Sequence, residues 1–440
     1  MPASSSDLHF LKIGICGYGT VGRGTHDLLV KNKSIIARRL DRIHLKVTYI
    51  ASRNLSKAVC GVDKWSTDPI ELVNDSEVDI VVEALGGLDT AFEVVKKALL
   101  ASKNVVTANK ALIATHGNEL VNLASKNGVR LLFESAVAGG IPILKSLREG
   151  LAANNINWLA GIINGTGNYI LTEMGNRQRL FSDVLQEAQA LGYAEADPSF
   201  DVEGTDAAHK LAIMASIAFG MPLAFDKTYI EGISSLELDD IMYASELGYC
   251  IKHLGIARLS EQCVQMRVHP ALVSLDELLA SVDGVGNAVV VNADPIGSTM
   301  YSGPGAGAEA TASAVVADLI DLARSPKPIS QAHIVPSLGF SRLVTDFEIL
   351  DIERIESEYY LRINVEDHVG VMANITGLLE KSGISIDAVI QKEKSKNCVQ
   401  IVILTHMCIE QVLNSAIAEI ENLKSVRSSV VRIRVASFEK

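Results

Sequence analysis

Short apolar runs alternate with amphipathic stretches between Phe10 and Ala136. The runs predict strands, and they are Leu11 to Cys16, Leu45 to Ala51, Asp79 to Ala84, Val105 to Thr107 and Arg130 to Ser135. Between them, apolar residues recur at three- and four-residue spacing, which predicts helices at Thr20 to Val30, Thr90 to Ala101 and Asn118 to Lys126. Strands that alternate with helices in this way are typical of βαβ units on a parallel sheet. Residues 1–140 are therefore expected to form a doubly wound α/β domain.

The pattern changes after Ile141 to longer helices and scattered glycine turns, which predicts an α+β domain over residues 141–325. Its clearest amphipathic helices are Leu180 to Leu191 and Thr205 to Phe219, and its strands are Ala288 to Val291 and Ser298 to Tyr301. A glycine-rich loop, Ser302 to Gly307, then precedes a helical pattern from Thr311 to Ala323 that could return to the first domain.

Prolines and polar residues predict a linker over residues 326–356. Beyond it the order is strand, helix, strand, strand, helix, strand, at Tyr360 to Val365, Gly370 to Ser382, Ile384 to Gln391, Cys398 to Thr405, Ile409 to Ile420 and Val430 to Val435. That order is the ferredoxin-like arrangement, so we expect residues 357–440 to form a third domain.

Length and composition agree with a protein of several domains. The chain has 440 residues, at about 150 per domain, and it is 48% hydrophobic and 21% charged, which excludes disordered and fibrous classes. Its net charge is −12 and it lacks a Lys/Arg-rich run, so a nucleic-acid partner is disfavoured. The six cysteines are scattered without a CxxC pair, which favours a reduced compartment. With neither a leader pattern nor a long apolar run, we expect a cytoplasmic protein with no membrane contact.

The first predicted strand runs into Gly17-Tyr18-Gly19-Thr20-Val21-Gly22, a GxGxxG turn before a helix. The first glycine makes the turn, the second admits a pyrophosphate and the third allows close packing of helix on strand. Ordinary tight turns also use glycines, but this position inside βαβ units indicates a Rossmann-type dinucleotide site.

Two cations lie where such a site needs them. The second strand ends in Ile50-Ala51-Ser52-Arg53, so Arg53 stands where an NAD-selective site would carry a carboxylate. A guanidinium pairs with a 2′-phosphate, so NADP is favoured over NAD, the alternative being a solvated arginine. Lys110 ends another strand segment and would face the nicotinamide or a substrate carboxylate, the alternative being a lone surface lysine.

Charged residues gather before and within the predicted helix that starts at Thr205. Asp206 and Lys210 are four residues apart and share a face, with Glu203 just before them. They could form an exposed ion pair, but the helix continues with Leu211 to Ala215, so we expect this end to be buried. Buried carboxylates beside a lysine suit the binding of an ammonium group and the supply of a proton.

These motifs resemble homoserine dehydrogenase of the amino-acid-regulated type. The resemblance covers about residues 10–325, and the tail is similar to an ACT domain. It is carried by the Gly17 to Gly22 turn, Thr107 to Lys110, Asn164 to Ile170, the Leu191 to Lys210 segment, and Gly303 to Gly307 with Thr311 to Val315.

The resemblance implies NAD(P)-dependent interconversion of L-aspartate 4-semialdehyde and L-homoserine, in threonine, methionine and isoleucine biosynthesis. It implies that Lys210 is the general acid and that Lys110 orients substrate and nicotinamide. An ammonium aimed at the carbonyl oxygen would stabilise the charge that hydride arrival creates there. By the same resemblance, the substrate's amino group is held by Glu195 and Asp206 with Asp201 nearby, and Gly305 approaches the nicotinamide.

The resemblance implies three further features. A sodium ion would be held largely by backbone carbonyls at Glu134, Val137, Gly139 and Ile141, although an ordinary strand-to-loop turn would look the same. The domain at 141–325 would be catalytic and dimerising, so we expect a homo-oligomer, either a dimer or a tetramer. The segment Asp367 to Thr376 resembles the first loop of ACT domains, which implies feedback by an amino-acid effector, threonine, unless the domain only dimerises.

Two alternatives stay open. Aspartate-semialdehyde dehydrogenase acts on the same aldehyde but needs a thiolate nucleophile, and Cys16 lies inside the first strand. A non-catalytic regulatory protein that binds a nucleotide and an amino acid would need neither Lys110 nor Lys210.

Overall fold

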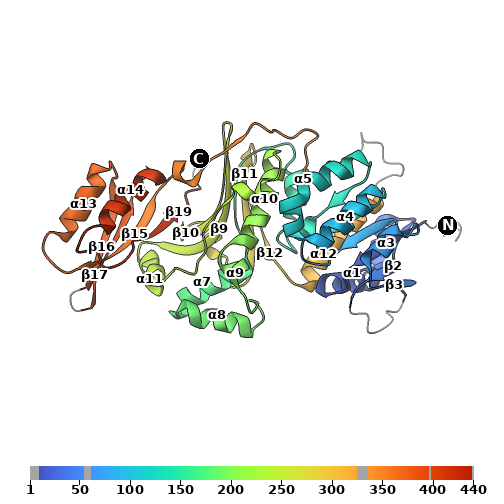
Figure 1. Ribbon diagram of the computed structural model, residues 1–440, viewed down its shortest axis with the longest axis horizontal. Helices are drawn as coiled ribbons and strands as arrows, with labels where there is room; N and C mark the ends of the chain where they lie inside the picture. Colours follow the sequence, from blue (N-terminus) through green and yellow to red (C-terminus); the bar gives the residue numbers. More distant parts are fainter. Residues whose placement is uncertain (1–8, 54–60, 325–334, 396–397, 439–440) are drawn as a thin grey trace. The chain divides into compact units, whose positions relative to one another are not determined.

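The computed structural model describes residues 9–53, 61–324, 335–395 and 398–438 (Figure 1). They divide into two compact units. Unit 1 comprises Met1–Asn157, His209–Asp226 and Asn287–Phe347, and unit 2 comprises Trp158–Ala208, Lys227–Gly286 and Glu348–Lys440. The first residues of the chain, Cys60 and the prolines at 326 and 328 lie outside the described residues.

Unit 1 contains a parallel sheet of six strands in the order β3-β2-β1-β4-β5-β6. The strands are β1 His9–Cys16, β2 Ile43–Ala51, β3 Lys64–Ser66, β4 Ile80–Glu83, β5 Asn104–Thr107 and β6 Leu131–Leu132. The helices are α1 Thr20–Lys31, α2 Lys33–Leu40, α3 Pro69–Asn74, α4 Asp89–Leu100, α5 Lys110–Lys126 and α12 Ala308–Arg324. This is the strand order of the dinucleotide-binding fold, which confirms the doubly wound prediction.

The core of this sheet explains why α12 belongs to unit 1. On β1, Leu11, Ile13 and Ile15 alternate with residues of the other face and are almost fully buried. They share one hydrophobic cluster with Val315 and Leu319 of α12. Helix α12 also packs beside α1, while α4 packs beside α5 (Figure 1). The predicted helix at 311–323 thus packs on the first strand of the chain.

Some predicted bounds of unit 1 were wrong. The strand expected over 130–135 is only β6, because Glu134–Ala136 forms a 3₁₀ turn. The helix expected over 118–126 begins at Lys110, where the Asn109 side chain accepts a hydrogen bond from Leu112 N at 3.0 Å and caps the helix. Short or half-exposed elements, namely α2, β3 and α3, were not predicted.

The remainder of unit 1 contains a strand pair and a segment from the expected linker. Strands β11 Gly286–Asp294 and β12 Gly297–Pro304 are neighbours, where two strands were predicted. Within the expected linker, Leu338 is buried, and Val344 N donates a 2.7 Å hydrogen bond to Gly220 O. This part of the linker range is therefore packed against the unit.

Unit 2 is built on a long mixed sheet whose order runs β7-β9-β10-β19-β15-β17-β16. Strands β9 Tyr249–Ser260 and β10 Cys263–Ser274 form an antiparallel hairpin beside β7 Asn155–Ile162. The helices of this region are α7 Gly165–Arg177, α8 Phe181–Ala190, α9 Ser199–Val202, α10 Thr205–Phe219 and α11 Leu238–Glu246. The division between the two units passes through α10, after Ala208.

The C-terminal segment has the predicted ferredoxin-like order. It runs β15 Tyr359–Glu366, α13 Val371–Lys381, β16 Ile386–Ser395, β17 Cys398–Thr405, α14 Glu410–Glu421 and β19 Val431–Val435. Its sheet continues that of the preceding region, because Ala271 and Leu272 of β10 pair in parallel with Arg434 and Val435 of β19. The two parts of unit 2 therefore share a sheet and one hydrophobic cluster.

Candidate functional site

The glycine-rich turn has the geometry that a dinucleotide requires. Gly17 has φ +95°, and a Cβ there would lie 2.3 Å from Ala84 O. A Cβ on Gly22 would lie 1.9 Å from Gly17 O, so the third glycine permits the close packing of α1 on the turn. A Cβ on Gly19 would meet no atom within 4 Å, so the space beside the second glycine is open. That is the position at which a pyrophosphate approaches the backbone.

The start of α1 and the end of β2 also fit the cofactor. Gly19 is the N-cap of α1 and provides no side-chain cap, so the first amides of the helix can donate to phosphate oxygens. Arg53 follows the end of β2 and is exposed. The residues present therefore suit an NAD(P) molecule.

Lys110 begins α5, at the carboxyl edge of the sheet, and is half-buried. The turn before it is tied to the end of β4, since Thr107 Oγ1 donates to Glu83 Oε2 at 2.5 Å and Asn109 Nδ2 donates to Gly87 O at 2.7 Å. Sequence reasoning assigned no role to Glu83. The signal that could have identified Glu83 is a carboxylate at the end of an apolar strand, at the carboxyl edge of the parallel sheet.

The acidic residues of unit 2 are brought together by Asn164. Its Nδ2 donates to Asp201 Oδ1 at 2.8 Å and to Asp206 Oδ2 at 2.9 Å, while its Oδ1 accepts from Gly167 N and caps α7. Asp206 is buried and Asp201 is half-buried. Sequence reasoning used Asn164 only as part of the family resemblance, although an Asn before Gly-Thr-Gly is a cap signal.

Glu195 is exposed on a loop whose main chain is held by hydrogen bonds from neighbouring helices. Gln189 Nε2 donates to Glu195 O at 3.1 Å, and Thr166 Oγ1 donates to Tyr193 O at 2.7 Å. The main chain of this loop is thus anchored to α7 and α8, and the Glu195 carboxylate reaches solvent.

Helix α10 carries the predicted acid. Lys210 is 9% exposed and Asp206 is 4% exposed, so the start of α10 is buried as expected. His209 is also buried, and its ring lies 4.2 Å from that of Phe225, centroid to centroid.

The predicted sodium segment is a buried turn of reversed handedness. Ala138 and Gly139 have φ +53° and +46°, so the backbone adopts the left-handed region at two successive residues. Side-chain Oε1 of Glu134 accepts from Leu144 N, and its Oε2 has no hydrogen-bond partner among the described residues. Burial and the nearby Asp318 carboxylate raise the pKa of Glu134 to about 8. Main-chain carbonyl and carboxyl oxygens are the ligands that fit a hard cation.

Gly305 lies against this segment for reasons of packing. A Cβ on Gly139 would lie 2.6 Å from Gly305 O, and a Cβ on Gly305 would lie 2.1 Å from Cγ of the buried Asn287. Glycine is therefore required at 305 by its protein neighbours, independently of any cofactor.

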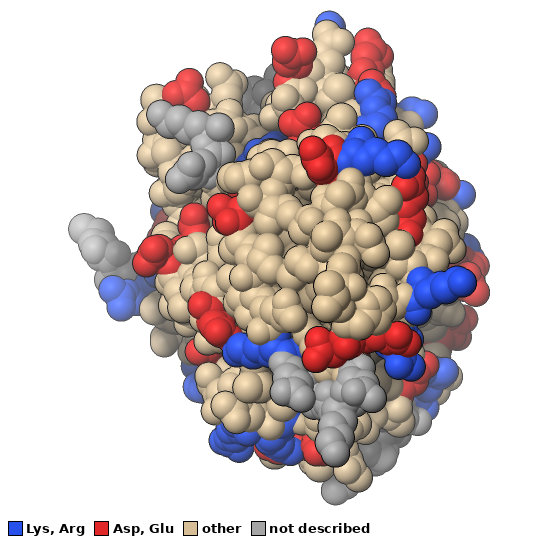
Figure 2. Space-filling model, turned by 90° about the vertical axis from the view of Figure 1, so that its left-hand side faces the viewer, with Lys and Arg blue, Asp and Glu red and all other residues tan. Residues whose placement is uncertain are grey.

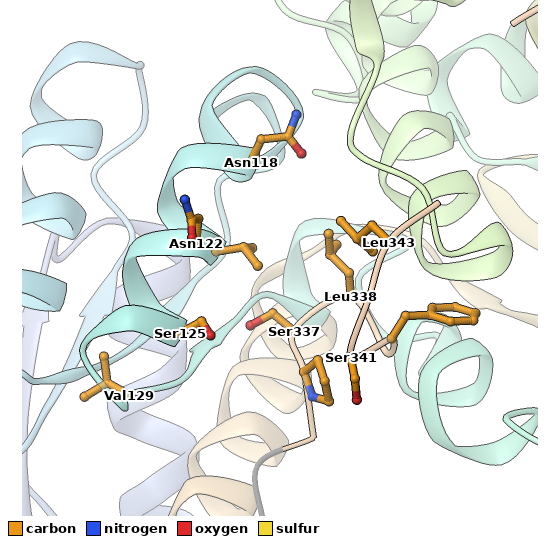
Figure 3. A pocket seen from close by; sticks show the side chains of 11 residues that line it. Asn118, Asn122, Ser125, Val129, Ser337, Leu338, Ser341 and Leu343 are labelled. Atoms are coloured by element: carbon orange, nitrogen blue, oxygen red, sulfur yellow. The ribbon is translucent and has the colours of Figure 1, made fainter. Parts of the chain in front are cut away.

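A cavity of about 490 Å³ lies between α5 and residues 336–343 (Figure 3). Asn118, Asn122 and Ser125 line it from the later part of α5, whereas Lys110 stands at the start of that helix. None of its described lining residues is charged, so the cavity lacks a cation for a phosphate or a carboxylate.

Three of the five described cysteines are poorly suited to the thiolate chemistry of the first alternative. Cys16 is fully buried, and burial together with the carboxylates of Glu83 and Asp68 raises the pKa of its thiol. Burial likewise raises the pKa of Cys250 and Cys408. These thiols are kept protonated, which is unfavourable for a nucleophile.

Among the described residues, no helix has both the length and the apolar character needed to span a membrane. In the same residues, no group of three His, Cys, Asp or Glu side chains is placed to hold a metal ion.

The parallel sheet with its glycine-rich edge, followed by a helix that begins with buried Asp206 and Lys210, defines the class of this protein as an NAD(P)-binding oxidoreductase. Family models agree. Residues 17–134 match "Homoserine dehydrogenase, NAD binding domain", residues 142–320 match "Homoserine dehydrogenase" and residues 359–425 match "ACT domain".

Individual proteins agree over nearly the whole chain. A homoserine dehydrogenase of Pseudomonas aeruginosa is 54% identical, with 97% of this chain and 98% of that protein covered. The crystal structure of a homoserine dehydrogenase from Thiobacillus denitrificans superposes with a TM-score of 0.92 at 50% identity, covering 98% of this chain and 99% of that one. A hyperthermophilic archaeal homoserine dehydrogenase in complex with NADPH has a TM-score of 0.61 at 28% identity, covering 76% of this chain and all of that one. The chain belongs to the homoserine dehydrogenase family.

Proposed function

We propose that this protein reversibly reduces L-aspartate 4-semialdehyde to L-homoserine with NADPH, as a cytoplasmic enzyme of threonine, methionine and isoleucine biosynthesis. The observation that carries the proposal is the buried start of α10. Lys210 and Asp206 lie there one helical turn apart, and Asn164 links Asp206 to Asp201. A proton donor and paired carboxylates are what an amino-aldehyde substrate requires.

When bound, the nicotinamide supplies or accepts the hydride. Lys210 donates a proton to the carbonyl oxygen as the aldehyde becomes an alcohol, and it takes that proton back in the reverse direction. Lys110 orients the substrate and the nicotinamide. Because negative charge develops on the oxygen only as the hydride arrives, an ammonium aimed at that oxygen lowers the barrier more than it strengthens ground-state binding.

The carboxylates bind the substrate's ammonium group. Asp206 and Glu195 accept its hydrogen bonds, with Asp201 beside them. Asn164 holds Asp201 and Asp206 in a fixed arrangement, which reduces the ordering cost of binding.

The cofactor is NADP in preference to NAD. The GxGxxG residues Gly17 to Gly22 hold its pyrophosphate, and Arg53 pairs with the 2′-phosphate. This is supported by the open space at Gly19 and by the absence of a carboxylate at the position of Arg53. Lys110 and Gly305 would lie toward the nicotinamide end of the bound cofactor.

A sodium ion would be held mainly by main-chain oxygens of Glu134, Val137, Gly139 and Ile141, where it would brace the turn beside Gly305. Support comes from the left-handed turn at Ala138 and Gly139. Replacing sodium in the buffer by N-methylglucamine should lower activity, and an unchanged rate would refute this assignment.

The chain is proposed to divide its functions among a cofactor domain at 1–140, a catalytic and dimerising domain at 141–325 and an ACT domain at 357–440, joined by residues 326–356. The family matches at 17–134, 142–320 and 359–425 support these bounds. A homo-oligomer, dimer or tetramer, is supported by exposed apolar side chains of the ACT segment such as Val389, Met407 and Ile409. The face shown in Figure 2 has a largely uncharged centre.

Threonine is proposed to act at the loop Asp367 to Thr376, where Gly370 has φ +96° and Val369 is fully exposed. Truncating the chain before this domain would remove β19 from its pairing with β10, so a point variant is the better test. Threonine should inhibit the wild type, and Asn374→Ala should shift the inhibition curve. Identical curves would refute this site.

The reaction itself is tested by following NADP reduction at 340 nm with L-homoserine as substrate. We expect saturable, homoserine-dependent reduction that needs no phosphate, with a higher kcat/KM for NADP than for NAD. Reduction that depends on the semialdehyde and phosphate, without any response to homoserine, would show the thiolate-dependent alternative instead. Binding of nucleotide without turnover would show the regulatory one.

A further inference from the structure

Glu83 is a fully buried carboxylate at the carboxyl end of β4, and the mechanism above does not use it. It follows the apolar residues Ile80 to Val82, so a hydrophobic side chain would suit the core at this position. In the strand register, Glu83 pairs with Cys16 of β1 on one side and with Thr107 of β5 on the other. It therefore stands in the middle of the edge at which the dinucleotide binds.

The carboxylate connects two loops of unit 1. Its Oε1 accepts from Leu85 N at 2.8 Å, in the loop after β4, and its Oε2 accepts from Thr107 Oγ1 at 2.5 Å, at the end of β5. The main-chain oxygen of Glu83 also accepts from Ala108 N at 3.3 Å. Burial raises the pKa of Glu83, while the donors of Thr107, Leu85 and Gly86 oppose that rise by stabilising the charged form.

Asn109 connects the same two loops a second time. Thr107 Oγ1 accepts from Asn109 N at 3.0 Å, and Asn109 Nδ2 donates to Gly87 O in the loop after β4. Asn109 is the cap of α5, and Lys110 is the first residue of that helix. The Glu83–Thr107 and Thr107–Asn109 bonds therefore connect the Glu83 carboxylate to the residue that precedes Lys110.

The loop after β4, which Glu83 contacts through Leu85, borders open space. Gly86 and Gly87 have φ +74° and +73°, and a Cβ on either would meet no atom within 4 Å. Without a fixed partner, two successive glycines would be conformationally free. Their main chain is instead held by Glu83 through Leu85 and by Asn109 through Gly87.

We propose that Glu83 is a positioning residue of the dehydrogenase, which fixes the Thr107 to Lys110 turn against the Gly86–Gly87 loop and so sets where the Lys110 ammonium meets the substrate and the nicotinamide. This inference rests on the proposed function, and in particular on the role of Lys110. A misplacement of a catalytic group by about 1 Å costs roughly 10²-fold in rate, so the effect of Glu83 is expected in turnover.

The test is a double-variant cycle on the full chain, measuring kcat and KM for homoserine with Glu83→Gln, Lys110→Ala and the two together. Gln keeps the shape but replaces one acceptor oxygen with a donor. We expect Glu83→Gln alone to lower kcat by about 10–100-fold, because it would displace the Lys110 ammonium, and to have an effect below about 2-fold when Lys110 is already Ala. A merely structural role would give losses that multiply.

Three further variants keep the test decisive if Glu83→Gln folds poorly. Thr107→Ser retains the hydroxyl and should stay near wild-type kcat, whereas Thr107→Val should reproduce the Glu83→Gln loss. Asn104→Ala, at the other end of β5, removes a buried bond to Arg130 N and should lower the melting temperature with kcat unchanged.

The outcomes separate this inference from the proposed function. If Lys110→Ala is slow while Glu83→Gln and Thr107→Val keep the wild-type kcat, the positioning role of Glu83 is wrong and the function stands. Multiplying losses in the cycle would overturn the positioning role in the same way. If Lys110→Ala itself turns over normally, the proposed role of Lys110 fails first.

Discussion

Replacing Asp240 by Asn should strongly destabilise the contact between the ACT segment and the rest of unit 2. Asp240 lies on α11 and Arg362 on β15, and both side chains are fully buried. Arg362 donates to the two carboxylate oxygens at 2.6 and 3.0 Å, and Tyr360 OH adds a third bond at 3.1 Å. Removing the charge of Asp240 leaves the buried guanidinium with only the half-exposed Glu237 carboxylate, whose Oε2 lies 3.1 Å from Arg362 Nη1, and this loss costs about 3–5 kcal/mol. For a unit of roughly 200 residues this lowers Tm by about 6–20 °C.

Thermal unfolding followed by circular dichroism measures this loss. The matched control is Glu419→Gln, which breaks an exposed pair with Lys381 in the same segment and should cost less than about 1 kcal/mol. Adding Arg362→Met to Asp240→Asn removes a buried charge that only the half-exposed Glu237 still balances, and it should recover part of the stability. Equal Tm values for Asp240→Asn and the control would refute the view that this buried pair fastens the ACT sheet.

Three further predictions concern the cofactor site and pH. Gly19→Ala should fold normally but raise the KM for NADP by about tenfold or more, equivalent to about 1.4 kcal/mol, whereas Gly22→Ala should prevent normal folding because its Cβ would lie 1.9 Å from a backbone oxygen. A Gly19→Ala protein with an unchanged KM for NADP, or a Gly22→Ala protein with a wild-type melting curve, would contradict this prediction. Arg53→Asp should raise the KM for NADP by about 10–100-fold and leave the KM for NAD near normal. An equal change in the two KM values would exclude a contact between Arg53 and the 2′-phosphate. Burial, with two guanidinium groups nearby, lowers the pKa of His269 well below 6.5. The unfolded chain therefore takes up the proton first, and stability should fall by about 1.4 kcal/mol per pH unit below about 6.5, less so in His269→Gln.

The doubly wound domain and the ACT segment could be predicted because their strands are short and apolar and their helices have one buried face. The hairpin of β9 and β10 was missed because its interior is not uniformly apolar. Buried Lys252, His253, Arg267 and His269 interrupt the hydrophobic pattern. Their burial depends on partners from distant segments, such as Asp283 for Lys252, which a local pattern does not contain.

The candidate active site could likewise be predicted only where a local motif marks its residues. Gly17 to Gly22, Lys110 and Lys210 stand in motifs whose spacing has a physical reason, so each could be named from sequence. Asn164 and Glu83 act through partners 37 and 24 residues away, and only the fold brings those partners within hydrogen-bond distance. Gly305 could be named, but its packing against Asn287 could not be foreseen.

The central claim is that Lys210 protonates the carbonyl oxygen as the hydride is transferred. The most direct measurement is NADPH oxidation by L-aspartate 4-semialdehyde with Lys210→Met, compared with the wild type and with Lys227→Met at an exposed lysine. We predict that Lys210→Met lowers kcat by about 10²–10⁴-fold with little change in the KM for NADPH, while Lys227→Met behaves as the wild type. A folded Lys210→Met protein whose kcat stays close to the wild-type value would contradict the account.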